Sequence, residues 1–149
     1  MHLKIKTLIR GVSKDHIKQG FTKQLFLSLN PPLPKVRLLQ FDGCKSGDRV
    51  GLELNFMLFR QKWVSEIVED GEDELMWYFI DKGVLLPFFL SAWEHRHIVE
   101  GVKAGSVIID DISFSTGYLI TDLFLYPLLS LQFLYRKPIY RRWFKSSSD

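Results

Sequence analysis

One feature of the sequence restricts its fold more than any other: a long, almost uncharged stretch near the C-terminal end. Residues 117–135 contain a single charged residue, Asp122, among many large apolar ones. The stretch is nominally long enough to cross a bilayer, and a basic segment follows it, as at a cytoplasmic membrane edge. Polar residues and Pro127 interrupt it, however, and a carboxylate in mid-span costs about 2.5–3.5 kcal/mol. We therefore expect a long helix packed inside a water-soluble domain, with a membrane anchor or interfacial helix as the alternative.

Alternating apolar and polar residues precede this helix and predict half-buried strands. The pattern is clearest in residues 49–58, where Val50, Leu54 and Leu58 alternate with Glu53 and Asn55. The other expected strands cover residues 3–10, 36–40, 61–68, 74–80, 88–100 and 106–115. Turns are expected at residues 42–47, 69–71, 81–83 and 101–105. Consecutive strands with tight turns predict an antiparallel meander.

A helix is expected between the first two strands. Ser13 is a suitable N-cap, and apolar residues then recur every four positions, at Ile17, Phe21, Leu25 and Leu29. This spacing predicts one amphipathic helix that ends near residue 30, because three prolines follow within residues 31–34.

Composition limits the classes of function. A chain of 149 residues with 46% apolar content is expected to form one domain, residues 1–149. The formal net charge of +3 is too balanced to argue for nucleic acid. The single cysteine, Cys44, excludes an internal disulfide and a cysteine-rich zinc site, and we expect an inert thiol and no cofactor. Residues 1–10 show no secretory signal pattern, so the expected location is the cytoplasm.

The order of these elements has a consequence for binding. A sheet of this extent cannot leave its apolar face in water, and the C-terminal helix is the only element long enough to cover it. A twisted sheet wraps around such a helix and leaves a gap between the two. Because the side chains facing this gap are apolar, the gap has the usual form of a small-molecule site.

Four segments carry a resemblance that covers nearly the whole chain: PPLPKVRLLQFDG from Pro31, LPFFLSAWEHRHIVEG from Leu86, VIIDDISFST from Val107 and RKPIYRRWF from Arg136. The chain resembles the START-like helix-grip superfamily, also called SRPBCC, which includes lipid-transfer START domains and the birch pollen allergen group. More narrowly, it is similar to bacterial ligand-binding SRPBCC domain proteins.

The resemblance implies an α+β helix-grip fold, in which a curved antiparallel sheet of about six to seven strands wraps around a long C-terminal helix. It also implies an internal apolar cavity that binds a lipid-like or polyketide-like molecule. Some members are polyketide cyclases, aromatases or hydroxylase components. The superfamily shares no single catalytic motif, so no catalytic residue is assigned.

Ten residues are predicted to contact the ligand. Trp93, His95 and the neighbouring His97 occupy every second position, so all three point to one face of one strand. Either this face lines the cavity, or the histidines lie on the sheet surface and bond to Asp110 or Asp111. The other predicted wall residues are apolar: Leu54, Phe56, Trp63, Phe114, Tyr118, Phe124, Leu128 and Leu131. The alternative for these is a filled core without a cavity.

The histidines and aspartates of the predicted strands do not predict a metal site from the sequence alone. Two histidines at positions i and i+2 could begin one, but no third ligand is indicated by the pattern, and we expect no metal. Asp110 and Asp111 are adjacent and therefore face opposite ways on a strand. We expect one of them to turn inward or to pair with His95, His97 or Arg96, because a buried acid needs such a partner.

Three functional hypotheses follow. The first is a binding protein for a small hydrophobic molecule, without nucleic acid as a partner. The second is a cyclase or dehydratase type of enzyme in which His95 or His97 transfers protons. The third is an interaction or membrane-edge protein that uses the C-terminal helix and its basic residues: Arg136, Lys137, Arg141, Arg142 and Lys145. The identity of the ligand, catalysis and the oligomeric state stay open.

Overall fold

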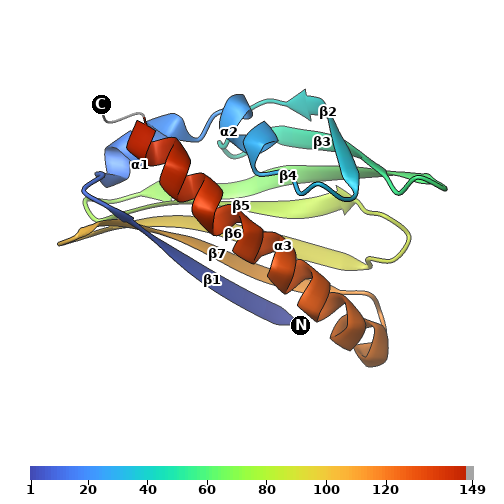
Figure 1. Cartoon of the computed structure of the whole chain (residues 1–149). Helices are drawn as coiled ribbons and strands as arrows, with labels where there is room; N and C mark the ends of the chain where they lie inside the picture. The colour runs from blue at the N-terminus through green and yellow to red at the C-terminus, as the bar shows by residue number, and fades with distance from the viewer. Residues whose placement is uncertain (147–149) are drawn as a thin grey trace.

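Seven strands form one curled antiparallel sheet in the computed structural model, which describes residues 1–146 (Figure 1). The strands are β1 (His2–Arg10), β2 (Lys35–Phe41), β3 (Arg49–Asn55), β4 (Arg60–Glu72), β5 (Met76–Leu85), β6 (Ala92–Val102) and β7 (Gly105–Ser115). Their order across the sheet is β1-β7-β6-β5-β4-β3-β2, so the first strand pairs with the last. The predicted antiparallel meander is confirmed. Residues 147–149, the end of the predicted domain, lie outside the described residues.

A single long helix, α3 (Leu119–Ser146), crosses one face of this sheet (Figure 1). It continues through Pro127 and Pro138. The carboxylate of Asp122 accepts hydrogen bonds from the backbone N–H of Thr116 at 2.6 Å and from its hydroxyl at 2.7 Å, which fixes the first turn of the helix. No helix within residues 1–146 combines the length and the apolar character that crossing a membrane requires.

Two apolar clusters hold α3 against the sheet. Near its C-terminal end, Tyr140 and Phe144 are fully buried against residues of the N-terminal helices and of strands β4 to β7. Further toward its start, Leu129 and Phe133 pack against residues of β1, β6 and β7. The sheet therefore wraps around the helix, and the predicted helix-grip arrangement is confirmed.

Two strands run further than the alternation predicted. β4 continues through residues 69–71 and β5 through residues 81–83, both of which were expected to be turns. The turn between them lies at residues 73–75, where Asp73 Oδ1 accepts hydrogen bonds from the backbone N–H groups of Leu75 and Met76. As a result Asp81 is a strand residue, paired in register with His95, and its side chain is buried.

The strand predicted over residues 49–58 ends earlier, at Asn55. Asn55 Oδ1 accepts a hydrogen bond from the backbone N–H of Met57 at 2.9 Å, and Met57 has a φ of 73°, so the chain reverses there. Leu58 is consequently 95% exposed, and the prediction that it belongs to the apolar face is wrong.

The helix predicted over residues 13–30 is two helices, α1 (Lys14–Gly20) and α2 (Lys23–Ser28). Ser13 caps α1 as predicted, and Thr22 caps α2. The break lies where Gly20 meets α3, since a Cβ there would stand 2.5 Å from the ring of Phe144. The break also lets Phe21 turn inward onto the ring of Trp77.

Candidate binding cavity

A cavity of about 520 Å³ lies between the sheet, the N-terminal helices and α3. Its wall includes residues of β2 to β6, of α2, of the proline-rich segment 31–34 and of α3. Most of these side chains are apolar; β3 alone contributes Val50, Leu52 and Leu54. A mostly apolar cavity of this size with a few polar groups is typical of a small-molecule site.

The structure brings seven of the ten predicted contact residues into the cavity wall. They are Leu54, Phe56, Trp63, Trp93, His95, Leu128 and Leu131. The other three lie elsewhere. Phe114 is buried in the cluster between β1, β7 and α3, while Tyr118 and Phe124 are 75% and 74% exposed. The long helix turns its early residues outward, which alternation in the strands could not predict.

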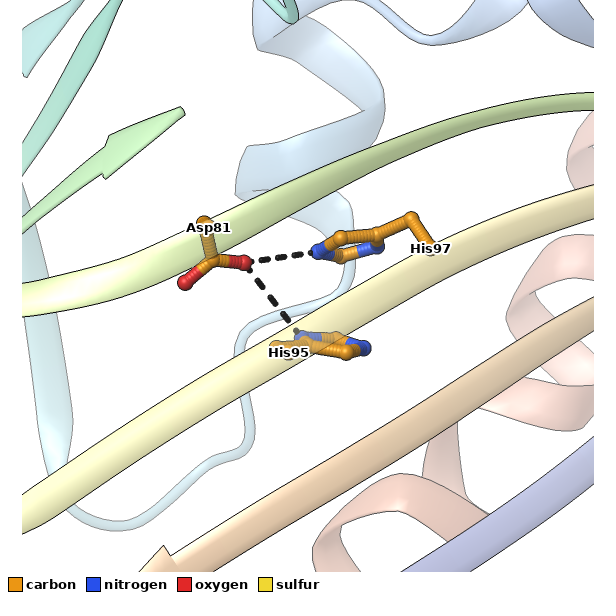
Figure 2. A group of neighbouring side chains, drawn as sticks. All are labelled: Asp81, His95 and His97. Carbon is orange, nitrogen blue, oxygen red and sulfur yellow. Dashed lines mark hydrogen bonds and ion pairs between the residues drawn. The ribbon is translucent and has the colours of Figure 1, made fainter. Parts of the chain in front are cut away.

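The face of β6 that the sequence left open points into the cavity. Trp93 and His95 are buried, His97 is nearly so, and all three line the wall. On the neighbouring strand β5, Asp81 stands opposite His95 and faces both imidazole rings (Figure 2). Asp110 of β7 is also buried, whereas Asp111 faces outward toward His2 and Lys4. The expectation that one of the two acids turns inward to a histidine is confirmed for Asp110.

Five side chains form what we call the polar network: Asp81, His95, His97, Asp110 and Arg136. Asp81 Oδ2 lies 3.0 Å from His97 Nε2 and 3.7 Å from His95 Nδ1. His95 Nε2 lies 2.9 Å from Asp110 Oδ1, and Arg136 Nη1 approaches the same oxygen at 3.8 Å. Asp81 Oδ1 accepts a hydrogen bond from the indole N–H of Trp93 at 3.2 Å. The network therefore links three strands to α3.

Burial and mutual contact set the ionisation of these groups. Burial and, next to it, the charge of the neighbouring His95 lower the pKa of His97 to about 4, so His97 is neutral at neutral pH. Burial raises the pKa of Asp81, but the hydrogen bond with His97 and the charge of His95 outweigh it and leave that pKa below its ordinary value. The same balance holds for Asp110, with His95 and Arg136 as the stabilising neighbours. Both carboxylates are thus ionised.

The network is incompletely hydrogen-bonded. Among residues 1–146, five buried side-chain atoms that can hydrogen-bond lack a partner, and four of them lie in or beside the network: His97 Nδ1, Asp110 Oδ2, Arg136 Nε and the Tyr140 hydroxyl. The fifth is the hydroxyl of Thr7. Buried polar groups are normally satisfied, so this concentration marks the part of the wall formed by His97, Arg136 and Tyr140 as a place where further atoms can bind.

Sequence reasoning missed three polar members of this wall. Asp81 was assigned to a turn because Asp, Lys and Gly follow one another at residues 81–83. Arg136 was grouped with the basic C-terminal residues, yet its side chain is only 13% exposed and its guanidinium lies 4.1 Å from the ring centre of Phe133. Tyr140 lies one turn beyond Arg136 on α3, so the two residues share one face of the helix. This spacing is the sequence signal from which both could have been identified as members of the wall.

Comparisons with known proteins agree with the fold. No protein-family profile and no curated protein sequence matches this chain. Among solved structures, it is similar to the Zhui aromatase/cyclase from Streptomyces sp. R1128, with a TM-score of 0.69 and 13% identity over 100% of this chain and 96% of that one.

Two further structures show the same likeness. The di-domain aromatase/cyclase StfQ of the steffimycin biosynthetic pathway matches with a TM-score of 0.73 and 11% identity, over 99% of this chain and 51% of StfQ, about half its length. A norcoclaurine synthase from Thalictrum flavum, solved with a transition-state analogue, matches with a TM-score of 0.65 and 11% identity, over 100% and 95% of the two chains. The chain therefore has the helix-grip fold that these structures share.

Proposed function

We propose that this chain acts as a single START-like domain that binds a small hydrophobic ligand between the sheet and α3. The observation that carries the proposal is the apolar cavity of about 520 Å³ with one polar network on its wall. The apolar wall supplies affinity, and the network orients the ligand through groups such as His97 and Arg136.

Burial of apolar surface favours such binding. A ligand that buries about 300 Å² of apolar surface gains roughly 7 kcal/mol at 25 cal/mol per Å². Association costs at least about 4 kcal/mol in lost freedom, so burial of that area alone leaves roughly 3 kcal/mol. A micromolar Kd corresponds to about 8 kcal/mol, so hydrogen bonds to the network or a larger buried area must supply the difference. The aromatase/cyclase and norcoclaurine synthase folds support a lipid-like or polyketide-like ligand with several rings or a folded chain.

A fluorescent apolar probe, 1-anilinonaphthalene-8-sulfonate, tests the proposal directly. We expect saturable binding of one probe per chain, and displacement by unlabelled fatty acids or polycyclic phenols. Leu52→Trp places a larger side chain in the cavity wall and should abolish probe binding. Leu85→Trp is the matched control, because Leu85 is 48% exposed and lies outside the cavity wall. Equal probe binding by both variants would contradict the proposal.

A second candidate function is an enzyme of the cyclase or dehydratase kind. The observation that favours it is His95, which lies between the carboxylates of Asp81 and Asp110 and faces the cavity. An imidazole held in this way can transfer a proton to or from a bound ligand. If a turnover is found and both His95→Gln and His97→Gln leave it unchanged, this assignment is wrong.

The outer face of α3 supports the interaction hypothesis as a third candidate. Leu119, Ile120 and Phe124 of α3, and Tyr118 directly before it, are all more than half exposed, and exposed apolar patches mark contact surfaces. Co-sedimentation with vesicles of anionic phospholipid tests a membrane-edge role. Protein that stays in the supernatant at low salt rules this role out.

A further inference from the structure

We propose that Asp81, His95 and His97 form a binding site for one divalent first-row transition-metal ion, such as Zn²⁺ or Co²⁺. Two imidazole nitrogens and one carboxylate oxygen are a donor set that suits these ions better than Mg²⁺ or Ca²⁺, which prefer oxygen alone. The third ligand, which the histidine spacing on β6 lacks, comes from the neighbouring strand β5 (Figure 2).

The geometry already places the three donors around one point. Zinc lies about 2.0–2.2 Å from nitrogen and oxygen ligands, so donors that share an ion stand roughly 3 to 3.5 Å apart. Asp81 Oδ2 is 3.0 Å from His97 Nε2 and 3.7 Å from His95 Nδ1, and the three ligand atoms all lie within 4.8 Å of one another. Small side-chain rotations suffice to bring all three within coordination distance.

Groups behind the three ligands hold them in the state that binds a metal. His95 Nε2 lies 2.9 Å from Asp110 Oδ1, so a neutral His95 that carries its proton on Nε2 donates a hydrogen bond to Asp110 and directs the lone pair of Nδ1 toward Asp81. The indole N–H of Trp93 fixes the other oxygen of Asp81. Carboxylates and N–H donors in these positions are the usual outer partners of metal-binding histidines and acids.

The unpartnered nitrogen of His97 fits the same arrangement. When Nε2 of His97 coordinates an ion, its proton resides on Nδ1, a buried atom that otherwise lacks a hydrogen-bond partner among the described residues. Asp110 Oδ1 lies 3.9 Å from that nitrogen, which is too long for a hydrogen bond but close enough for the carboxylate to attract the proton electrostatically. The same carboxylate thus lies beside both histidines.

The charges in the network also call for a cation. Among residues 1–146, Asp81 has only the two imidazoles as ion-pair partners, while Arg136 lies beside Asp110 instead. A carboxylate buried in an apolar wall needs a positive partner. The ion supplies that charge at Asp81, and its remaining coordination positions face the cavity, where water or an oxygen of a bound ligand can occupy them.

Titration of tag-free protein with Co²⁺ after chelator treatment tests the site. We expect a saturable visible absorption spectrum with one ion per chain, displaced by Zn²⁺, and the same stoichiometry by calorimetry with Zn²⁺. His97→Gln and Asp81→Asn remove ligands and should abolish the cobalt spectrum. Asp110→Asn and Trp93→Phe remove outer partners and should weaken binding about 10–100-fold. Circular dichroism verifies folding, and His95→Gln, which also removes a ligand, replaces Asp81→Asn if the latter does not fold.

His2→Gln is the matched control, because His2 pairs with Asp111 on the exposed side of the sheet. We expect this variant to bind Co²⁺ as the unaltered chain does. The proposal is overturned if no saturable spectrum forms, if the spectrum survives His97→Gln, or if His2→Gln removes it. Since the apolar probe needs no ion, its binding to chelator-treated protein separates failure of this site from failure of the cavity.

Discussion

Phe133 and Phe124 lie on the same helix and offer a matched test of which face of α3 the sheet encloses. Phe133 is 2% exposed and packs against Trp93 and His95, with the guanidinium of Arg136 4.1 Å above its ring. Phe124 is 74% exposed. Replacing each by Ala removes the same atoms from a buried and from an exposed position.

The expected losses differ widely. Truncation of a buried Phe to Ala costs about 3–5 kcal/mol, and loss of the contact with the Arg136 guanidinium adds about 0.5–1 kcal/mol. For a chain of this length, each kcal/mol lowers Tm by roughly 2–4 °C, so Phe133→Ala should lower Tm by about 7–24 °C. Phe124→Ala should change the free energy of unfolding by less than about 0.5 kcal/mol.

Urea unfolding followed by tryptophan fluorescence and by circular dichroism measures both losses. Equal slopes against urea concentration would show that the variants unfold from the same compact state. Phe133→Leu keeps most of the apolar volume and should recover more than half of the loss. If Phe124→Ala destabilises as much as Phe133→Ala, the helix presents a different face to the sheet and the reasoning fails.

Three further predictions concern other parts of the chain. Burial raises the pKa of Cys44 to about 12, so iodoacetamide should label the native thiol at pH 8 much more slowly than the urea-unfolded one; equal rates would contradict its burial. Gly20→Ala should cost about 1–3 kcal/mol in thermal unfolding because the new Cβ meets Phe144; an unchanged Tm would refute this contact. Hydrogen bonds from Thr116 hold the pKa of Asp122 below its ordinary value, so the stability they provide is present above the unfolded pKa and is lost as pH falls through the folded one; Asp122→Asn should reduce this acid dependence of Tm.

The strands could be predicted from the sequence because alternation reports burial on one face. The first strand and the alternation through Leu54 are examples, and both follow from a sheet with one covered face. Alternation fails where local chemistry resembles a turn. The local sequence around Asp81 predicts a turn, so its place in a strand was not predicted. The partners that stabilise its burial come from β6, which is distant in sequence.

The sequence predicted the cavity-wall residues on the strands better than those on α3. Leu128 and Leu131 reach the wall, whereas Phe124 does not, because the rotation of a helix about its axis depends on contacts with the whole sheet. Almost every position of α3 near residue 124 is apolar, so no polar stripe indicates the exposed face. Arg136 was missed for a related reason: a charge followed by other charges is expected in solvent.

The most direct test of the central claim is methyl NMR of the chain saturated with the apolar probe. If the ligand occupies the space between the sheet and α3, the methyl resonances of Leu54 and Leu129 will shift strongly, since both line the cavity. Those of Leu75 and Val84, exposed and outside the wall, will stay in place. Shifts confined to exposed methyl groups such as these would contradict the account.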